Sequence, residues 1–300
     1  MSAPASSELR AETLFPVGVA ALAKRYDGFL LDQWGVLHDG TTAYPGAVDC
    51  LERLRAADKT IIILSNSGRR GRENEAVLAG MGFGRELYHH IVSAGDDAHE
   101  ALLRRDEPAY RDLGERCLLI ARPGEEYLAD GLGFSLTADP DQADFILNLT
   151  FDPERQPLPG WRPLLERGAA RGIPMICGNP DRHRVHASGR LHEAPGLLAL
   201  AYEELGGQVH YHGKPYPRIY RSCFGIMGLP PEKVLAVGDS LAHDVAGAAN
   251  AGIGACFIAG GIHKDELVWP DGDAPEAESC FALFARDDQH PRYCIPRFAW

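Results

Sequence analysis

The chain has 300 residues, of which 45% are hydrophobic and 24% are charged. This globular composition excludes a disordered, collagen-like or coiled-coil protein, and the length predicts one large or two compact domains. The formal net charge of −12 argues against the broad basic surface that nucleic-acid-binding proteins use.

The sequence has no sign of a membrane or secreted protein. It lacks the basic and apolar start of a secretion signal, and no apolar stretch approaches the roughly 20 residues that span a bilayer. Its seven cysteines are scattered without C-x-x-C spacing, which predicts inert thiols rather than disulfides or a zinc site. We therefore expect a cytoplasmic protein without nucleic-acid or membrane partners.

Short apolar runs alternate with helix-like segments along the chain, which indicates an α/β fold with a doubly wound, mostly parallel sheet. The first run is residues 29–31. An amphipathic helix is predicted next, with Val48, Leu51 and Leu54 at three-residue steps and Pro45 in its first turn. Later runs lie at residues 61–64, 117–120, 145–147, 175–177, 234–237 and 255–258. The last forty residues look rich in loops.

Three of these runs end in polar residues that suit phosphate chemistry. Asp32 follows the first run, Ser65 to Gly68 follow the second, and Asp239 follows the sixth. Ligands of open α/β sheets gather at the carboxyl ends of the strands, so we expect these residues to meet there. The hydroxyl of Ser65 and the backbone N–H groups after it are suited to holding phosphate oxygens.

Two further sets of residues complete this pattern. Lys214 supplies a positive charge for the same anion, and Asp239 and Asp244 are spaced to hold Mg²⁺ together with the carboxylate after the first run. His210 and His212 precede the lysine and, if extended, share one strand face, so we expect them near the site. Each residue alone fits an ordinary cap, turn or surface position. Together they describe carboxylate attack on a phosphoryl group.

This set of residues resembles the haloacid dehalogenase-like (HAD) hydrolase superfamily over most of the chain. Residues 32–37 look like its first motif, Ser65-Asn66 its second, Lys214 its third, and residues 238–244 its fourth. The resemblance implies a Rossmann-like core made of residues 1–98 and 204–300, with an α/β cap at 99–203. Residues 151–153 and 179–181 resemble cap landmarks of the subfamily IIA-like branch of p-nitrophenylphosphatase-like, nucleotide and pyridoxal phosphatases.

The resemblance also implies a role for each matched residue. Asp32 would be the nucleophile and a Mg²⁺ ligand, with the backbone carbonyl of Trp34 and the side chain of Asp239 as further ligands and Asp244 in support. The remaining candidates would position the phosphate or select the substrate: Ser65, Asn66 and Lys214 in the core, and Asn179, Asp181 and His183 in the cap. The expected substrate is a small phosphorylated metabolite held between core and cap, and a homodimer is possible.

One position departs from the pattern of the phosphatases in this superfamily. Their residue two after the nucleophile is a second Asp, which protonates the leaving oxygen and later activates water, whereas here it is Trp34. General acid–base help is typically worth about 10²–10⁴ in rate, so ordinary alkyl phosphates should be poor substrates. His38 and Asp39 are the nearest candidates to replace the missing group, unless they only form a turn before the helix.

The tryptophan leaves three functions open. The first is a phosphatase whose substrate has a good leaving group or supplies its own acid. The second is a catalytically weak or inactive regulatory protein that binds phosphate and Mg²⁺. The third, C–P or C–halogen cleavage, agrees less well with the phosphatase-like cap. A phospho-accepting receiver domain is excluded because its acidic pair would precede the phospho-acceptor, whereas Asp239 and Asp244 follow Lys214.

Overall fold

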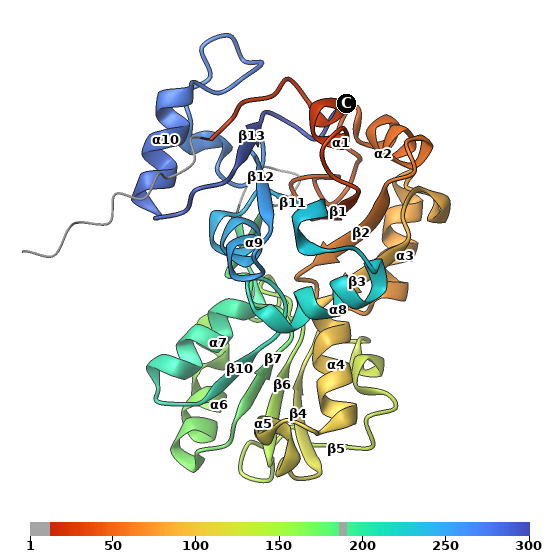
Figure 1. Ribbon diagram of the computed structural model, residues 1–300. Helices are drawn as coiled ribbons and strands as arrows, with labels where there is room; N and C mark the ends of the chain where they lie inside the picture. The colour runs from red at the N-terminus through yellow and green to blue at the C-terminus, as the bar shows by residue number, and fades with distance from the viewer. Residues whose placement is uncertain (1–12, 186–190) are drawn as a thin grey trace, which may run out of the picture.

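The computed structural model describes residues 13–185 and 191–300. Figure 1 shows two lobes, each built around one parallel sheet. The sheet of the upper lobe has the strand order β13-β12-β11-β1-β2-β3. Its strands are β1 (Gly28–Leu31), β2 (Thr60–Ser65), β3 (His90–Ser93), β11 (Val234–Gly238), β12 (Gly254–Ile258) and β13 (Tyr293–Ile295). The predicted α/β fold with a doubly wound parallel sheet is confirmed.

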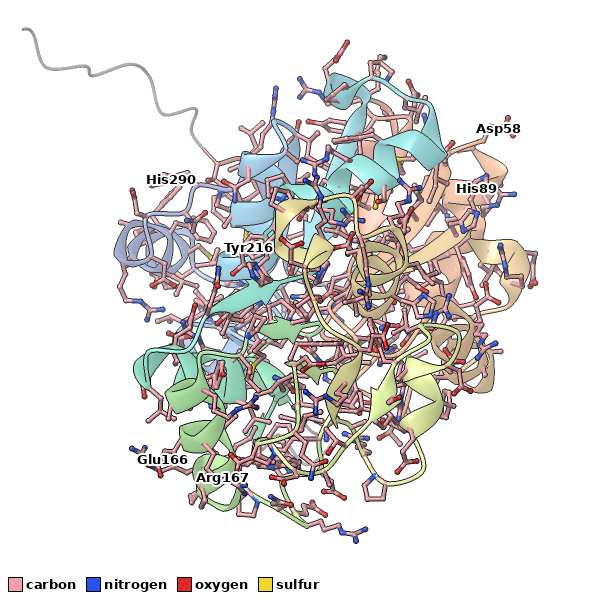
Figure 2. The ribbon with its side chains drawn as sticks, turned by 90° about the horizontal axis from the view of Figure 1, so that it is seen from below. Asp58, His89, Glu166, Arg167, Tyr216 and His290 are labelled. Carbon is pink, nitrogen blue, oxygen red and sulfur yellow. The ribbon has the colours of Figure 1, made fainter. Side chains whose placement is uncertain are left out.

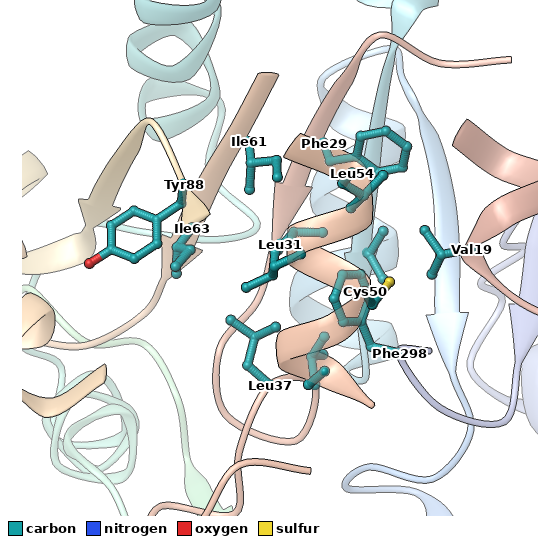
Figure 3. Packing of buried hydrophobic residues seen from close by; sticks show 14 of the residues in the cluster. Val19, Phe29, Leu31, Leu37, Cys50, Leu54, Ile61, Ile63, Tyr88 and Phe298 are labelled. Carbon is teal, nitrogen blue, oxygen red and sulfur yellow. The ribbon is translucent and has the colours of Figure 1, made fainter. Parts of the chain in front are cut away.

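Both faces of this sheet are buried, which explains why its strands are continuous apolar runs. In β1, Phe29 and Leu31 join one core cluster while Leu30 joins the other, and β2 alternates in the same way. Figure 3 shows the first cluster, in which Leu54 and Cys50 of the neighbouring helix lie against β1. One cluster includes residues from α1 (Val19–Ala23), α2 (Ala47–Ala56) and α3 (Gly71–Gly80), and the other from α8 (Pro217–Met227), α9 (Ala246–Asn250) and α10 (Ala277–Arg286).

The lower lobe has a five-stranded sheet in the order β10-β7-β6-β4-β5. Its strands are β4 (Arg116–Ile120), β5 (Ser135–Leu136), β6 (Phe145–Asn148), β7 (Met175–Cys177) and β10 (Val209–Tyr211). It is accompanied by α4 (Ala94–Arg104), α5 (Pro108–Arg111), α6 (Leu158–Arg171) and α7 (Pro195–Glu204), and by the hairpin of β8 (His183–Val185) and β9 (Leu191–Glu193). Short 3₁₀ or π turns complete the described elements: η1 (Arg85–Leu87), η2 (Glu126–Ala129), η3 (Pro231–Lys233), η4 (Leu241–Val245) and η5 (Lys264–Glu266).

Several expectations differ in detail from this structure. The lower lobe spans residues 94–211, beyond both ends of the expected 99–203 cap, because α4 packs on its sheet and β10 pairs with β7. The predicted helix begins at Ala47, so Pro45 lies before it rather than in its first turn, and Gly46 has the positive φ of 85°. The C-terminal region contains α10 and the short strand β13, which its prolines and loops concealed.

Two simpler expectations concern cysteines and membranes. All seven cysteines are buried and free, as expected for buried thiols. Among the described residues, every helix is too short or too polar to cross a bilayer.

A buried charged cluster joins the two connections between the lobes. Asp97 of α4 accepts hydrogen bonds from His212 Nδ1 at 2.6 Å and from Arg218 Nε at 2.9 Å. His212 Nε2 lies 3.0 Å from the hydroxyl of Tyr110, and Arg218 also pairs with Glu107. The Asp97 side chain is 1% exposed, so its charge depends on these partners rather than on water. The cluster therefore fixes α4 against the segment that leads from β10 to α8.

Asp97→Asn should destabilise the protein by about 3 kcal/mol, because it leaves the half-buried Arg218 and the buried His212 without their shared carboxylate. Urea unfolding followed by circular dichroism measures this loss. The control is Glu100→Gln on the same helix, which removes only an exposed pair with Arg104 and should cost under about 0.5 kcal/mol. A loss from Asp97→Asn no larger than that of the control would contradict the assigned role of the cluster.

Candidate active site

The carboxyl ends of three neighbouring strands bring the predicted residues together. Asp32 directly follows β1, Ser65 ends β2, and Asp239 directly follows β11. Since β11, β1 and β2 are adjacent and parallel, their ends lie at one edge of the sheet. The N–H of Asp32 donates to the carbonyl of Val237 at 2.9 Å, which continues the ladder to the carboxylate itself.

A compact charged cluster lies at this edge. One oxygen from each of Asp32, Asp239 and Asp244 lies within 4.8 Å of the others. Lys214 Nζ is 2.7 Å from a carboxylate oxygen of Asp32 and 2.7 Å from one of Asp244. The lysine side chain is only 3% exposed, so both contacts are shielded from water. The structure thus brings together the four charged residues that the sequence singled out.

The electrostatics of the cluster show an excess of negative charge. Burial raises the pKa of Asp32 to about 7, with Lys214 opposing the shift and Asp244 adding to it. Burial and then the charges of Asp32 and Asp244 raise the pKa of Asp239 well above its ordinary value. Burial alone would lower the pKa of Lys214, but the two carboxylates beside it raise it. Three close carboxylates with one ammonium group are a donor set that fits a divalent cation.

The second motif, Ser65-Asn66, is hydrogen-bonded to Lys214 and to its own neighbours. The Asn66 side chain accepts a hydrogen bond from the Lys214 N–H at 2.7 Å and donates to the Lys214 carbonyl at 3.2 Å. Ser65 Oγ accepts from Gln33 Nε2 at 2.5 Å and from the N–H of Ser67 at 3.1 Å. In this structure the N–H of Ser67 is therefore engaged by Ser65, whereas we expected it to turn toward phosphate.

Trp34 has a loop shaped around its ring. A Cβ on Gly40 would come within 2.2 Å of the indole, and Gly40 has φ of 93°, so glycine is required there. Gly35 is equally constrained, with φ of 83° and a Cβ position 1.9 Å from Asp239 Oδ2. The indole meets the His38 ring edge to face at a centroid distance of 5.5 Å. The assignment of the Trp34 carbonyl as a metal ligand stays a prediction.

Neither candidate for the missing acid lies in the cavity that Asp32 lines. Asp39 accepts hydrogen bonds from the N–H groups of Thr41 and Thr42 and so only forms the turn. His38 is buried, and its Nδ1 accepts from the N–H of Gly40 at 2.9 Å. Burial lowers the pKa of His38 from 6.5 to about 4, so its ring is neutral at pH 7. The idea that either residue replaces the second Asp is not supported by this arrangement.

A cavity of about 520 Å³ opens in front of the charged cluster. Its walls include Asp32, Ser65, Asn66, Lys214, Asp239 and Asp244 from the core, and Asp181 and His183 from the lower lobe. Asp181 accepts from Asn66 Nδ2 at 2.8 Å and lies 3.1 Å from His243 Nδ1, so it joins the two sides of the cavity. Asn179 instead lines a smaller neighbouring cavity, and its side chain accepts the N–H of Asp181 at 3.1 Å.

The structure also adds residues that sequence reasoning missed. Tyr211 and Tyr216 line the larger cavity, and their rings stack at 5.4 Å with an interplanar angle of 4°. Figure 2 places Tyr216 inside the outline of the molecule, whereas Glu166 and Arg167 of α6 lie at its edge. His212 was expected near the site, but it is bound to Asp97 and Tyr110. The sequence could have indicated Tyr211, because it lies between His210 and His212 and so on the opposite face of an extended strand.

Two known families match this chain, and each match contains residues of the charged cluster. A family described as haloacid dehalogenase-like hydrolase matches residues 29–135, which carry Asp32 and Ser65. A second family, described as HAD-hydrolase-like, matches residues 211–277, which carry Lys214, Asp239 and Asp244. The chain belongs to the HAD-like hydrolases. Both halves of its site therefore lie in the segments that define this superfamily.

Two relatives and one solved structure each match most of the length of this HAD hydrolase. Human chronophin (Homo sapiens) is 28% identical over 97% of this chain and 97% of its own. The ribonucleotide monophosphatase NagD of Escherichia coli is 24% identical over 76% of this chain and 85% of its own. A solved HAD-like hydrolase from Brucella suis has a TM-score of 0.79 at 28% identity, covering 95% of this chain and 100% of its own.

The pH dependence of stability should reveal the buried neutral histidine of this HAD hydrolase. The pKa of His38 is lower in the folded state (about 4) than its ordinary 6.5, so folding favours the neutral ring. The contribution of the neutral His38 ring to the free energy of unfolding is complete above pH 6.5 and is lost as the pH falls toward 4. Between pH 7 and pH 5 the protein should lose about 2 kcal/mol more unfolding free energy than His38→Asn, which keeps an acceptor for Gly40. Urea unfolding at both pH values measures the difference, and equal losses would refute it.

Proposed function

We propose that this HAD hydrolase is a Mg²⁺-dependent phosphatase of a small phosphorylated metabolite. The observation that carries the proposal is the buried contact of Lys214 with Asp32 and Asp244 at 2.7 Å, beside Asp239 and in front of a cavity. Relatives whose names specify phosphatases support it, including NagD and the sugar-phosphatase AraL of Bacillus subtilis, which is 25% identical over 81% of this chain and 88% of its own.

In the proposed first step, a carboxylate oxygen of Asp32 attacks the phosphorus and the bond to the leaving oxygen breaks. Asp32 then carries the phosphoryl group as an aspartyl-phosphate, and attack of water on the phosphorus returns the carboxylate and releases phosphate. Lys214 offsets negative charge at the transferred group and, at 2.7 Å, favours the ionised form of Asp32. Asp32, Asp239 and Asp244 would hold Mg²⁺, whose charge counters that of the phosphoryl oxygens.

The proton for the leaving oxygen is the step that this site supplies least well. Trp34 stands where the phosphatases of the superfamily carry their second Asp, and an indole does not transfer a proton at neutral pH. The proposed substrate therefore has a leaving group that departs as a stable anion or one that carries its own acid. The same residue favours a second candidate function, a regulatory protein that binds phosphate and Mg²⁺ with little or no turnover.

Asp32→Asn should abolish phosphate release, because an amide is not a nucleophile toward phosphorus. The measurement is a Mg²⁺-containing release screen over phosphorylated metabolites and p-nitrophenyl phosphate, repeated with excess EDTA, which should also remove activity. Asp39→Asn is the matched control, since this nearby residue only forms the turn before α2, and its rate should stay within about twofold. Wild-type protein that releases phosphate from no substrate would refute the phosphatase.

Trp34→Asp should restore the missing proton transfer and raise kcat most for substrates with poor leaving groups. We expect a gain of about 10²-fold with an alkyl phosphate and a much smaller one with p-nitrophenyl phosphate. Steady-state kinetics on both substrates measure the contrast, with unfolding curves to check that the variant folds. Turnover that appears only in Trp34→Asp would instead favour the regulatory protein.

A further inference from the structure

A second, smaller cavity adjoins the candidate active site. Its volume is about 140 Å³, and it shares four lining residues with the larger cavity: Trp34, Ser65, Asp181 and Arg184. The two cavities therefore adjoin along these four side chains, one of which, Ser65, ends the strand next to Asp32. The smaller cavity has room for a carboxylate or phosphate group but is small for a large ring system.

Three arginines from separate parts of the chain line this smaller cavity. Arg69 follows β2 of the core, Arg122 follows β4, and Arg184 lies in the hairpin strand β8. All three are half-buried. Burial and the positive charges of Arg122 and Arg69 lower the pKa of Arg184, and the charges of Asp152 and Glu154 oppose this shift. The fold therefore gathers like charges at one place, which is unfavourable unless an anion joins them.

The protein itself neutralises only part of this charge. Arg69 pairs with Glu125 at 2.5 Å, but no carboxylate of residues 13–185 and 191–300 forms an ion pair with Arg122 or Arg184. Arg122 Nε donates only to the carbonyl of Phe151, at 3.2 Å. The N–H donors of the two guanidinium groups are thus largely available to a ligand.

The acidic residues near this cavity already have donors. Glu193 accepts the N–H of Leu158 at 3.0 Å, and Asp181 accepts from Asn66 and lies beside His243. Glu125 accepts from Arg69 and, at 2.6 Å, from the hydroxyl of Thr150. These three carboxylates are therefore engaged by groups other than Arg122 and Arg184.

His38 provides an independent observation of the same kind. It lines the smaller cavity, it is 2% exposed, and its Nε2 is buried without a hydrogen-bond partner among the described residues. Because its Nδ1 accepts from the N–H of Gly40, the proton of the neutral ring is on Nε2. A buried donor without an acceptor is costly, and His38 lines the same cavity as the arginines.

We propose that the smaller cavity is a subsite for a second anionic group of the substrate, a carboxylate or a phosphate, bound by Arg122 and Arg184. The inference rests on the proposed function, because it takes the phosphate ester to lie at Asp32. It names the substrate class as a small phosphate monoester with a further anion a few bonds from the ester oxygen. Trp34 would then serve as the wall between the two anions.

The test compares ligands that differ only in the second anion. The carboxylate arm pairs 2-phosphoglycolate with ethyl phosphate, and the phosphate arm pairs propane-1,3-diyl bisphosphate with propyl phosphate. Calorimetry with Mg²⁺ on the Asp32→Asn protein measures binding without turnover. At least one doubly anionic ligand should bind about tenfold or more tightly than its partner. The arm that shows this preference identifies the second group.

The preference is the ratio of the dissociation constants of the singly and doubly anionic ligands. This ratio should fall to about threefold or less in Arg122→Met and in Arg184→Met, both in the Asp32→Asn background. Arg116→Met is the matched control, because Arg116 begins the same strand β4 that Arg122 follows and pairs with Asp144 on the surface. It should keep the full preference. Unfolding midpoints of the variants show whether each one folds.

Equal binding of both members in both arms would overturn the subsite, and so would a preference that survives both arginine substitutions. Absence of binding by every ligand would also overturn it. Hydrolysis of p-nitrophenyl phosphate by the wild type, sensitive to Asp32→Asn, separates the two proposals. If that activity is present and the preference is absent, the phosphatase stands and the subsite fails. If the preference is present and no substrate is turned over, the phosphatase fails, and the smaller cavity binds the second anion of a ligand that is not hydrolysed.

Discussion

Lys214 is buried between Asp32 and Asp244, and an ammonium group in such a place costs several kcal/mol unless carboxylates are held at contact distance. Three chain segments must be placed together to satisfy it: the end of β1, the loop before α8 and the π turn η4 after β11. Asn66 adds a fourth by bonding both the N–H and the carbonyl of the lysine. The geometry of the site and the stability of the fold therefore depend on the same contacts.

Trp34 shapes both the loop after β1 and the cavities of the site. Gly40 leaves the space that the indole fills, and the His38 ring lies against it, so the loop is shaped for a large aromatic side chain. The indole borders both cavities. In the proposed phosphatase this side chain is a wall of the site rather than a proton donor, so the proton for the leaving oxygen would come from the substrate.

Much of this arrangement could be predicted from the residues. The apolar runs at 29–31, 61–64 and 234–237 are β1, β2 and β11, and their order along the chain was enough to expect Asp32 and Asp239 at one edge of the sheet. The cap residues were harder, because a side chain's direction depends on where its strand ends. β10 ends at Tyr211, so His212 faces Asp97 while Tyr211 lines the cavity. The three arginines lie on segments far apart in sequence, and no local pattern connects them.

The strand order also has a consequence for synthesis of the chain. β1 lies between β2, which follows it closely, and β11, which is made only after residues 32–233. At about 5–20 residues per second, one side of β1 waits roughly 10–40 s for its partner. The lower lobe, residues 94–211, is complete before then and has its own core clusters. The nascent core thus presents an unpaired apolar edge on the ribosome until β11 has been made.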